Sequence, residues 1–414
     1  MNVAVLVDLE LNKDAGGHVK YWQRIGESFE QSVSGLKITI FFLGKKNETI
    51  LQTKNLTFEI QKPILSSSIL KSIGIDADNT DLFPFNPKIF LKLRKFDLIH
   101  TTDQFFSMAK TAKIASNFWK IPLTTSIHTD TPPYTKYYIK KIIEKFFSKM
   151  KIIHSFLIKK IKIQDFFERR MFRKLEKYLS TTRHAMVADK IYSPQRLIKK
   201  TGNLNITKLN RGINKQIFKI KNKNKSKILK KYNIPYKDKL LFFVGRVHEL
   251  KGAVLLANIH RELNKKNNSV TTLMVGQDIH GKICLKASNG KLILLGYLDQ
   301  KQISDLYNVC DLFVFPSKFE IGPNVVIEAK ACGAICVVHS SGGGKRISKP
   351  GSDGIVIDNY LTSYWVKVID ELLNNKKKIN SMKKFISKQH VISWGEVFIN
   401  DIFIHWKKII SKKE

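Results

Sequence analysis

The chain has 414 residues, enough for two or three domains at roughly 150 residues each. Hydrophobic residues make up 43% of the chain and aromatic residues 10%, which is enough to bury a sizeable core and excludes a disordered protein. Lysine and arginine number 72 against 34 aspartates and glutamates, so the net charge of +38 indicates a polyanionic partner: nucleic acid, an anionic membrane surface or a phosphorylated substrate.

The basic charge comes mostly from lysine, because only 11 of the 72 basic residues are arginine. Proteins that read nucleic-acid sequence usually need arginine for bidentate contacts to bases, so its scarcity disfavours a nucleic-acid partner. Lysine, isoleucine, asparagine and phenylalanine are abundant together, as AT-biased coding would produce. Part of the charge is therefore open to a second interpretation, compositional drift.

The cysteines and the N-terminal segment bear on the compartment. Cys284, Cys310, Cys332 and Cys336 form no C-x-x-C pair, which disfavours a disulfide scaffold or a zinc ribbon and fits a reducing compartment. Residues 1–8 lack a basic segment and reach an acid too early for a signal peptide. No run of about eighteen apolar residues occurs, so no bilayer-spanning helix is expected.

Apolar strands alternate with helical patterns in the first half of the chain. Strands are predicted over residues 3–7, 38–43, 96–100 and 122–127, and helices over 18–29 and 104–117. This alternation is typical of βαβ units and indicates a parallel sheet.

A second series of the same kind follows, with strands predicted over residues 239–244, 271–275, 291–296, 311–315 and 334–338. Residues 219–227 are lysine-rich and lack periodicity, so they are interpreted as a solvated linker between the two series. We therefore predict an α/β protein with two Rossmann-like domains, residues 1–210 and 211–390, whose parallel sheets face each other across a cleft. Residues 391–414 are expected to form a C-terminal helix that returns to the first domain.

The strongest motif spans residues 317–333, after the strand predicted over 311–315, and places Glu320 and Glu328 eight positions apart. Pro323 or Asn324 is expected to start a helix, with Glu328 one turn into it and Glu320 in the loop before it. Both carboxylates can then face one ligand near a helix N-terminus, which favours phosphate or a polarised hydroxyl. The alternative is an ordinary loop-to-helix entry with glutamate as a capping charge.

This segment resembles the E-x7-E motif of retaining nucleotide-sugar glycosyltransferases of family 4 (glycosyltransferase group 1), which have the GT-B fold. Residues at the matching places are Ser317, Glu320, Glu328, Ala329, Ala331, Cys332 and Gly333. The resemblance implies that Glu328 binds the ribose hydroxyls of a nucleotide and that Glu320 holds the donor sugar. It makes Gly322, Asn324 and Val325 further donor-binding candidates.

Residues 244–252 resemble the G-R-x-x-x-x-K-G string of the same family. A glycine turn at the end of a strand brings the backbone near a ligand, and Arg246 and Lys251 can meet a diphosphate. Stabilisation of the leaving group by these cations would then replace a divalent metal. The alternative is two solvated basic residues. Gly296, at the end of another predicted strand, is expected to border the nucleotide base.

The first half contributes two loops. Gly16 and Gly17 follow the first strand, where the family also has two glycines, and they permit close approach of the backbone to a phosphate or an acceptor. Residues 126–134 resemble the S-x-H-T-x-x-P-x-Y loop of family members that build mannosides and glycolipids. The resemblance implies that His128 donates a hydrogen bond to the donor sugar or its phosphate, whereas the alternative is a structural histidine. His100 is a lesser candidate on the acceptor side.

Residues 136–178 carry fourteen basic and four acidic residues, a net charge of +10, with bulky apolar residues at helical spacing. Basic amphipathic helices of this kind bind anionic membrane surfaces. A pair of core-facing helices with a solvated lysine face is an equally weighted alternative.

Three other patterns are set aside. Asp76 and Asp78 form a D-x-D string, but no apolar strand precedes it. Residues 342–346 lack the spacing of a P-loop and the Ser or Thr after the lysine. Cys332 and Cys336 have no partnering ligands, so we expect no metal site.

The resemblance implies a retaining, metal-independent hexosyltransferase. It would use a UDP- or GDP-linked sugar as co-substrate, need no cofactor, and act on a membrane-associated acceptor such as diacylglycerol or another lipid. We expect it to be cytoplasmic and peripheral on the inner face of the membrane. A lipopolysaccharide or cell-surface polysaccharide glycosyltransferase, and a non-catalytic polyanion-binding protein, are the alternatives. The candidate catalytic residues are Glu320, His128, Arg246 and Lys251, and the donor-binding candidates are Gly16, Gly17, Arg246, Lys251, Gly296, Glu320, Gly322, Asn324, Val325 and Glu328.

Overall fold

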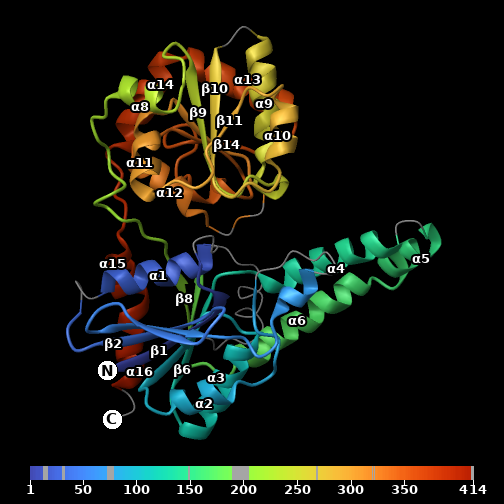
Figure 1. Cartoon of the computed structure of the whole chain (residues 1–414), viewed down its shortest axis with the longest axis vertical. Helices are drawn as coiled ribbons and strands as arrows, with labels where there is room; N and C mark the ends of the chain where they lie inside the picture. The colour runs from blue at the N-terminus through green and yellow to red at the C-terminus, as the bar shows by residue number, and fades with distance from the viewer. Residues whose placement is uncertain are drawn as a thin grey trace. The chain divides into compact units, whose positions relative to one another are not determined.

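The computed structural model describes residues 1–12, 17–29, 33–71, 79–147, 150–188, 205–266, 269–318, 320 and 322–411. The chain divides into two compact units (Figure 1). Unit 1 consists of Met1–Asn210 and Trp394–Glu414, and unit 2 consists of Arg211–Ser393.

Unit 1 is built on one mixed sheet. Within its described residues the strands are β1 (Asn2–Glu10), β2 (Lys37–Leu43), β3 (Glu48–Leu51), β4 (Leu56–Gln61), β5 (Leu98–Thr101), β6 (Leu123–Ile127), β7 (His184–Ala188) and β8 (Ile206–Leu209). Their order is β3-β4-β2-β1-β5-β6-β7-β8, and neighbours pair in parallel except for the antiparallel pair β3 and β4. The central strand β1 is buried from Val3 to Asp8, which explains its continuous apolar run.

Helices and the C-terminal segment complete unit 1: α1 (Gly17–Phe29), η1 (Ser67–Lys71), α2 (Pro87–Leu93), α3 (Ser107–Trp119), α4 (Thr131–Phe147), α5 (Lys151–Ser155), η2 (Phe156–Lys160), α6 (Ile163–Leu179), α15 (Trp394–Val397), η5 (Phe398–Phe403) and α16 (Ile404–Ile410). The C-terminal segment packs on α1 through large aromatic side chains. Trp22 stacks on Trp406 with ring centroids 6.4 Å apart, and Phe29 lies 5.8 Å from Phe398. All four side chains are fully buried.

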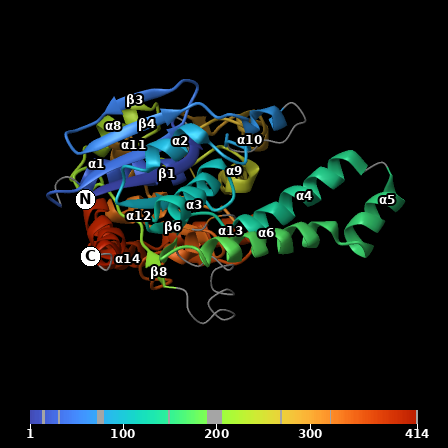
Figure 2. The same cartoon turned by 90° about the horizontal axis from the view of Figure 1, so that it is seen from below.

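Helices α4 and α6 form a hairpin that leads away from the sheet of unit 1, with α5 at its far end (Figure 2). Near the base of this hairpin, Lys136 of α4 pairs with Asp165 of α6 at 2.6 Å and with Glu168 at 3.1 Å. These carboxylates raise the pKa of Lys136 above its usual value, chiefly through the hydrogen bond to Asp165. The two helices are therefore joined by ion pairs, and Ile143 of α4 is buried.

Unit 2 is built on a parallel sheet. Its described strands are β9 (Lys239–Val244), β10 (Val270–Val275), β11 (Ile293–Leu294), β12 (Leu312–Phe315), β13 (Cys336–His339) and β14 (Ile355–Ile357), in the order β11-β10-β9-β12-β13-β14. The helices are α8 (Lys225–Lys231), η3 (Glu249–Lys251), α9 (Ala253–Lys265), α10 (Gly281–Ala287), α11 (Gln300–Val309), α12 (Asn324–Ala331), η4 (Gly343–Arg346), α13 (Thr362–Asn374) and α14 (Lys376–Ile386). Figure 1 shows α9 and α10 on one face of this sheet and α11 and α12 on the other.

The core of unit 2 is aromatic. Phe243 stacks on Phe315 at 5.9 Å, and Phe315 stacks on Phe313 at 6.0 Å. These side chains come from adjacent strands that are buried on both faces, as is usual for parallel sheets covered by helices. The prediction of two Rossmann-like α/β units with parallel sheets is thus confirmed.

Residues 219–227 lie inside unit 2 rather than between the units, so their interpretation as a linker is wrong, although most of them are exposed. Helix α8 begins at Lys225, and the Asn224 side chain accepts a hydrogen bond from Lys227 N–H at 3.0 Å. Lys223 pairs with Asp305 at 2.7 Å, and Lys225 pairs with Asp311 at 3.3 Å. The carboxylates that anchor the segment lie about eighty residues further along the chain, so local composition did not reveal them.

Candidate active site

The order of strands in unit 2 reverses between β9 and β12, because the chain runs outward from β9 to β11 and then returns to β12. In open parallel sheets, ligands bind beyond the carboxyl ends of the strands at such a switch point. The loops that leave β9 and β12 are residues 245–252 and 316–323, the two segments that carry the sequence motifs. We therefore build the candidate site from these loops.

Lys251 and Glu320 form an ion pair that joins the two loops. Ser317 Oγ donates a hydrogen bond to the carbonyl oxygen of Leu250 at 3.3 Å. Gly252, in the left-handed region with φ of +78°, lies so close to Pro316 that a Cβ there would be 2.7 Å from its backbone. The second glycine of the G-R-x-x-x-x-K-G string, Gly252, is thus required for close approach of the two loops.

The glycine turns at the ends of β9 and β10 lie backbone against backbone. Gly245 N–H donates to Val275 O at 2.9 Å, and a Cβ on Gly276 would clash with the carbonyl oxygen of Gly245. Gly276 N–H donates to Gly296 O at 2.7 Å. A Cβ added at Gly296, whose φ is +63°, would meet no atom within 4 Å, so open space adjoins this edge of the sheet.

Arg246 is exposed on the loop after β9, and its side chain makes no hydrogen bond or ion pair within the described residues of unit 2. The turn beside it is braced by two histidines whose rings stack 4.3 Å apart. His248 Nδ1 accepts a hydrogen bond from Leu250 N–H at 3.0 Å, and His280 Nδ1 accepts one from Glu249 N–H at 3.2 Å. The sequence analysis did not identify this histidine pair.

Helix α12 begins at Asn324, after Pro323 as its N-cap residue, which confirms the expected helix start. Glu328 lies one turn into the helix and is buried, whereas Glu320 precedes the helix and is partly exposed. Asn324 Oδ1 is shielded from solvent and accepts no hydrogen bond from a described residue. Val325, in the first helical turn, is partly buried.

A glycine-rich segment, residues 342–346, packs on the loop that carries Glu320. Lys345 Nζ donates to the carbonyl oxygen of Glu320 at 3.3 Å, and Ser341 Oγ donates to that of Lys318 at 3.1 Å. A Cβ on Gly322 would clash with the guanidinium of Arg346. The segment is not a P-loop, but its position directly after β13 was a signal that the sequence analysis did not use.

A buried ion pair fixes α12 to the segment after η4. Lys330 Nζ lies 2.6 Å from Asp353 Oδ2 and donates to Arg346 O at 3.0 Å. The fully buried Asp353 also accepts hydrogen bonds from Ser348 and from Lys349 N–H. Burial alone would raise the pKa of Asp353, but these hydrogen bonds outweigh it and hold the pKa well below its usual value.

In unit 1, His128 follows β6 and is held by side chains of α1. Trp22 Nε1–H donates to His128 Nε2 at 3.0 Å, His18 stacks on the His128 ring at 4.4 Å, and Tyr21 meets its face edge-on at 4.8 Å. His18, Tyr21 and Trp22 lie on one helical face, since their spacing is i, i+3, i+4. This spacing was readable in the sequence but was not interpreted.

A buried polar chain continues from His128 into the sheet. Ser126 Oγ lies 2.8 Å from His128 Nε2 and 3.0 Å from His100 Nε2, and His100 Nδ1 lies 2.9 Å from Thr124 Oγ1. Burial, with a smaller effect of His184, lowers the pKa of His100 to about 3, so its ring is neutral. His100 is fully buried among these hydrogen-bonded side chains, which fits a structural role better than a contact to an acceptor.

The remaining predicted residues and patterns are placed as follows. Gly17 is the exposed first residue of α1. Gly16, Asp76 and Asp78 lie outside the described residues. Among the residues that the structure describes, no group of three or more His, Cys, Asp or Glu side chains is arranged to hold a metal ion. In the same ranges, no helix is both long and apolar enough to cross a bilayer.

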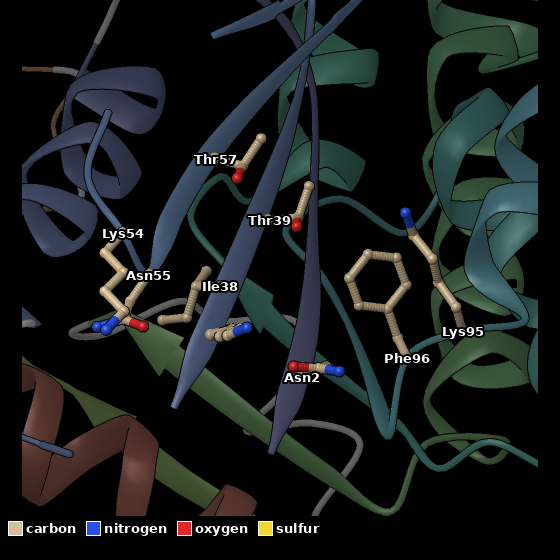
Figure 3. Close-up of a pocket in the computed structure, with 9 residues that line it drawn as sticks. Asn2, Ile38, Thr39, Lys54, Asn55, Thr57, Lys95 and Phe96 are labelled. Carbon is tan, nitrogen blue, oxygen red and sulfur yellow. The ribbon is translucent and has the colours of Figure 1, made fainter. Parts of the chain in front are cut away.

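Figure 3 shows a pocket of about 250 Å³ in unit 1. Its lining residues come from the amino ends of the strands and the turns before them: Asn2, Lys37, Ile38, Thr39, Lys54, Asn55, Thr57, Lys95 and Phe96. The pocket therefore lies at the end of the sheet opposite to His128, and we do not assign the candidate site to it.

Part of the chain matches a known protein family. Residues 224–389 match the family described as glycosyl transferases group 1. They comprise most of unit 2 and include both loops joined by Lys251 and Glu320.

Whole-chain similarity is found among solved structures. Sucrose-phosphate synthase from Thermosynechococcus elongatus superposes with a TM-score of 0.70 at 14% identity, covering 99% of both chains. HepE of Anabaena, solved in complex with UDP-glucose, superposes with a TM-score of 0.65 at 15% identity, covering 100% of this chain and 99% of that one. The fold is GT-B.

A curated relative, a D-inositol 3-phosphate glycosyltransferase of Thermobispora bispora, is 23% identical over 191 residues. The match covers 43% of this chain and 44% of the relative, so the chain spans less than half the length of that relative.

Proposed function

We propose that the protein is a retaining hexosyltransferase that uses a UDP- or GDP-linked sugar and a membrane-associated acceptor. The observation that carries this proposal is the junction at the switch point of unit 2, where Lys251 pairs with Glu320 inside the group 1 domain. A cation and a carboxylate placed together can bind two different parts of one nucleotide sugar. Lys251 would bind the diphosphate and Glu320 the hydroxyls of the sugar.

The other candidate residues take the remaining parts of the donor. Arg246 would bind the diphosphate, for which its exposed guanidinium is available. Glu328 would accept hydrogen bonds from the ribose hydroxyls, and His128 would donate one to the sugar or its phosphate. Gly296 would border the base, where the structure leaves open space.

The transfer would keep the anomeric configuration without a protein nucleophile. The bond from the anomeric carbon to the phosphate oxygen breaks, and a bond to the acceptor oxygen forms on the same face. The proton of the acceptor hydroxyl passes to the departing phosphate oxygen. Arg246 and Lys251 would stabilise the charge that develops on the diphosphate, which is the work a divalent metal does in other sites.

The comparisons support the donor class more than the acceptor. HepE binds UDP-glucose, which suggests a uridine nucleotide as the first donor to test. The excess of basic residues supports an anionic surface as the place of the acceptor, with the protein peripheral on the inner face of the membrane. A lipid acceptor such as diacylglycerol is therefore proposed ahead of a cell-surface polysaccharide.

A donor screen followed by a turnover assay tests the proposal. UDP, GDP and their hexose conjugates should raise the melting temperature of the group 1 domain, and one conjugate should release its nucleotide when lipid extract is added. Release should persist in EDTA. If release strictly required added Mg²⁺, the metal-independent mechanism would be contradicted, but the glycosyltransferase proposal would not. Stabilisation by a nucleotide sugar without any release would favour the non-catalytic polyanion-binding protein.

A further inference from the structure

The far end of the α4–α6 hairpin exposes large apolar side chains. We call residues 145–147 and 150–162 the hairpin tip; it contains α5, which Figures 1 and 2 both show at the end remote from the sheet of unit 1. Ile152 is 87% exposed, Phe146 57% and Phe156 48%. Met150, Ile153 and Ile161 are also exposed. Several large apolar side chains exposed together on one short segment indicate an interaction site.

The charge of the hairpin tip is of one sign. Residues 145–147 and 150–162 include five lysines and no acid. Lys159, Lys160 and Lys162 are exposed and have no acidic partner among the described residues. The acids further along the hairpin, Asp165 and Glu168, are paired with Lys136 near its base. The tip therefore presents unneutralised ammonium groups around its apolar side chains.

The lysines lie beside the aromatic rings. Lys145 Nζ is 5.9 Å from the ring centre of Phe146, and Lys160 Nζ is 5.9 Å from that of Phe156. In this arrangement a ring can enter an apolar layer while the ammonium group next to it stays at a charged boundary. Such a boundary exists where the acyl chains of a bilayer meet anionic headgroups.

The structure separates the two interpretations of residues 136–178. Outside the tip the hairpin contains buried residues, among them Ile143 of α4 and Leu175 of α6, so part of the segment is core. Within η2 no residue is buried, and the exposed side chains of the tip lie beyond the packed base. Phe146 lies on the exposed part and Phe147 is half-buried, although the two are adjacent.

We propose that the hairpin tip docks this protein on an anionic lipid bilayer, with Phe146, Ile152 and Phe156 inserted among the lipid chains. A second copy of the chain is the less suitable occupant, because a symmetric contact would bring two lysine-rich tips together. The docking itself depends only on the tip. Only the role of the docking, which is to bring a transferase to a lipid acceptor, rests on the proposed function.

Vesicle co-sedimentation of the full chain tests this proposal. Vesicles are made of phosphatidylcholine alone, or of phosphatidylcholine and phosphatidylglycerol in equal parts. The protein should pellet with the second and not with the first, and added salt should release it because surface charges are screened. Equal pelleting with both vesicles, or none with either, would overturn the proposal.

Matched variants assign the binding to the tip. Ile152→Ser with Phe156→Ser should weaken vesicle binding about tenfold or more. The control pair Leu91→Ser with Phe118→Ser, which are also exposed apolar residues of unit 1, should leave it unchanged. Lys159→Gln with Lys160→Gln should weaken binding roughly thirtyfold, and the control pair Lys376→Gln with Lys377→Gln should not. Tip variants that bind like the unchanged protein would overturn the proposal.

Two further measurements keep the outcomes distinct. Nucleotide-induced stabilisation, measured without vesicles, should be equal in the tip variants and the unchanged protein. If nucleotides stabilise neither the unchanged protein nor the tip variants, the proposed function is contradicted. The docking proposal would then still be decided by vesicle binding. Sedimentation without lipid should show no self-association through the tip. A dimer that the pair Ile152→Ser and Phe156→Ser dissociates would overturn membrane docking in favour of a second copy.

Discussion

The indole N–H of Trp22 donates a hydrogen bond to Nε2 of His128 at 3.0 Å. Because the indole nitrogen is a donor only, Nε2 must be the accepting, unprotonated nitrogen of the imidazole. A neutral His128 therefore carries its proton on Nδ1. Trp22 thus orients the ring and selects the tautomer in which Nδ1 is the hydrogen-bond donor.

Trp22→Phe should reduce transfer about tenfold, because without the indole donor the imidazole of His128 can place its proton on Nε2. A turnover assay measures this, with nucleotide binding expected to be unchanged. Trp406→Phe is the matched control: Trp406 is equally buried, and its indole nitrogen has no hydrogen-bond partner among the described residues. Equal turnover in the two variants would refute the role of Trp22.

Glu320→Ala and Glu328→Ala should each lower turnover about ten- to hundredfold while leaving the protein folded. Each would remove a charge-assisted contact to the donor, worth about 1.5–3 kcal/mol. Turnover and the melting temperature are measured on purified variants. Glu371→Ala, which alters an exposed glutamate of α13, is the control and should match the unchanged protein. Near-normal turnover in both variants of the pair would rule out the assignment.

Arg246→Ala and Lys251→Ala should each weaken nucleotide-diphosphate binding about tenfold or more, as measured by titration calorimetry. The melting temperature of Arg246→Ala should stay unchanged because this exposed side chain has no partner within the described residues of unit 2. Arg261→Ala, on α9, is the control and should bind normally. Unweakened binding in both site variants would show that the diphosphate lies elsewhere.

Lys330→Met should destabilise unit 2 by about 3–5 kcal/mol, because it leaves the carboxylate of Asp353 buried without its cation. Denaturant unfolding measures the change. Lys265→Met, which breaks an exposed pair with Glu262, should change stability by less than about 1 kcal/mol. Adding Asp353→Asn to Lys330→Met should restore part of the loss. A double variant no more stable than the single one would contradict the ion-pair explanation.

His100 and His184 should each lower the stability of unit 1 as the pH falls below about 6.5, the ordinary histidine value. Burial lowers the pKa of His100 to about 3 and that of His184 to about 4, where His405 and Lys408 add to the effect. Between these values and 6.5 only the unfolded chain binds the two protons, so acid favours unfolding by about 1.4 kcal/mol per pH unit for each histidine. The buried carboxyls of Asp8 and Asp103, whose pKa values burial raises, act in the opposite direction, so the test compares two proteins rather than reading the total slope. Denaturant unfolding between pH 7 and pH 5 is measured on the unchanged protein and on His184→Gln, which should lose the contribution of one histidine. Equal slopes in the two proteins would contradict the assignment.

Much of the architecture followed from the sequence. Runs such as residues 3–7 and 239–244 are apolar throughout because strands of a parallel sheet are covered on both faces, and this pattern is local. The helix start at Asn324 was equally local, because proline favours the beginning of a helix. The motifs after two strands predicted that their residues lie at one edge of the sheet in unit 2, since carboxyl ends of parallel strands lie together.

Contacts between segments far apart in the chain could not be predicted from the sequence. Lys251 and Glu320 meet across 69 positions because β12 returns to lie beside β9, after β10 and β11 have been placed on the other side. The packing of residues 342–346 on the Glu320 loop and the anchoring of Lys223 by Asp305 have the same origin. Exposure within the hairpin also depends on which side chains its partner helix covers. The sequence by itself determined the parallel sheets and the residues of the candidate site, because apolar runs and short motifs involve residues that are close together in the sequence. Only the tertiary structure decided which loops meet, because strand order is set by packing between segments far apart in the chain.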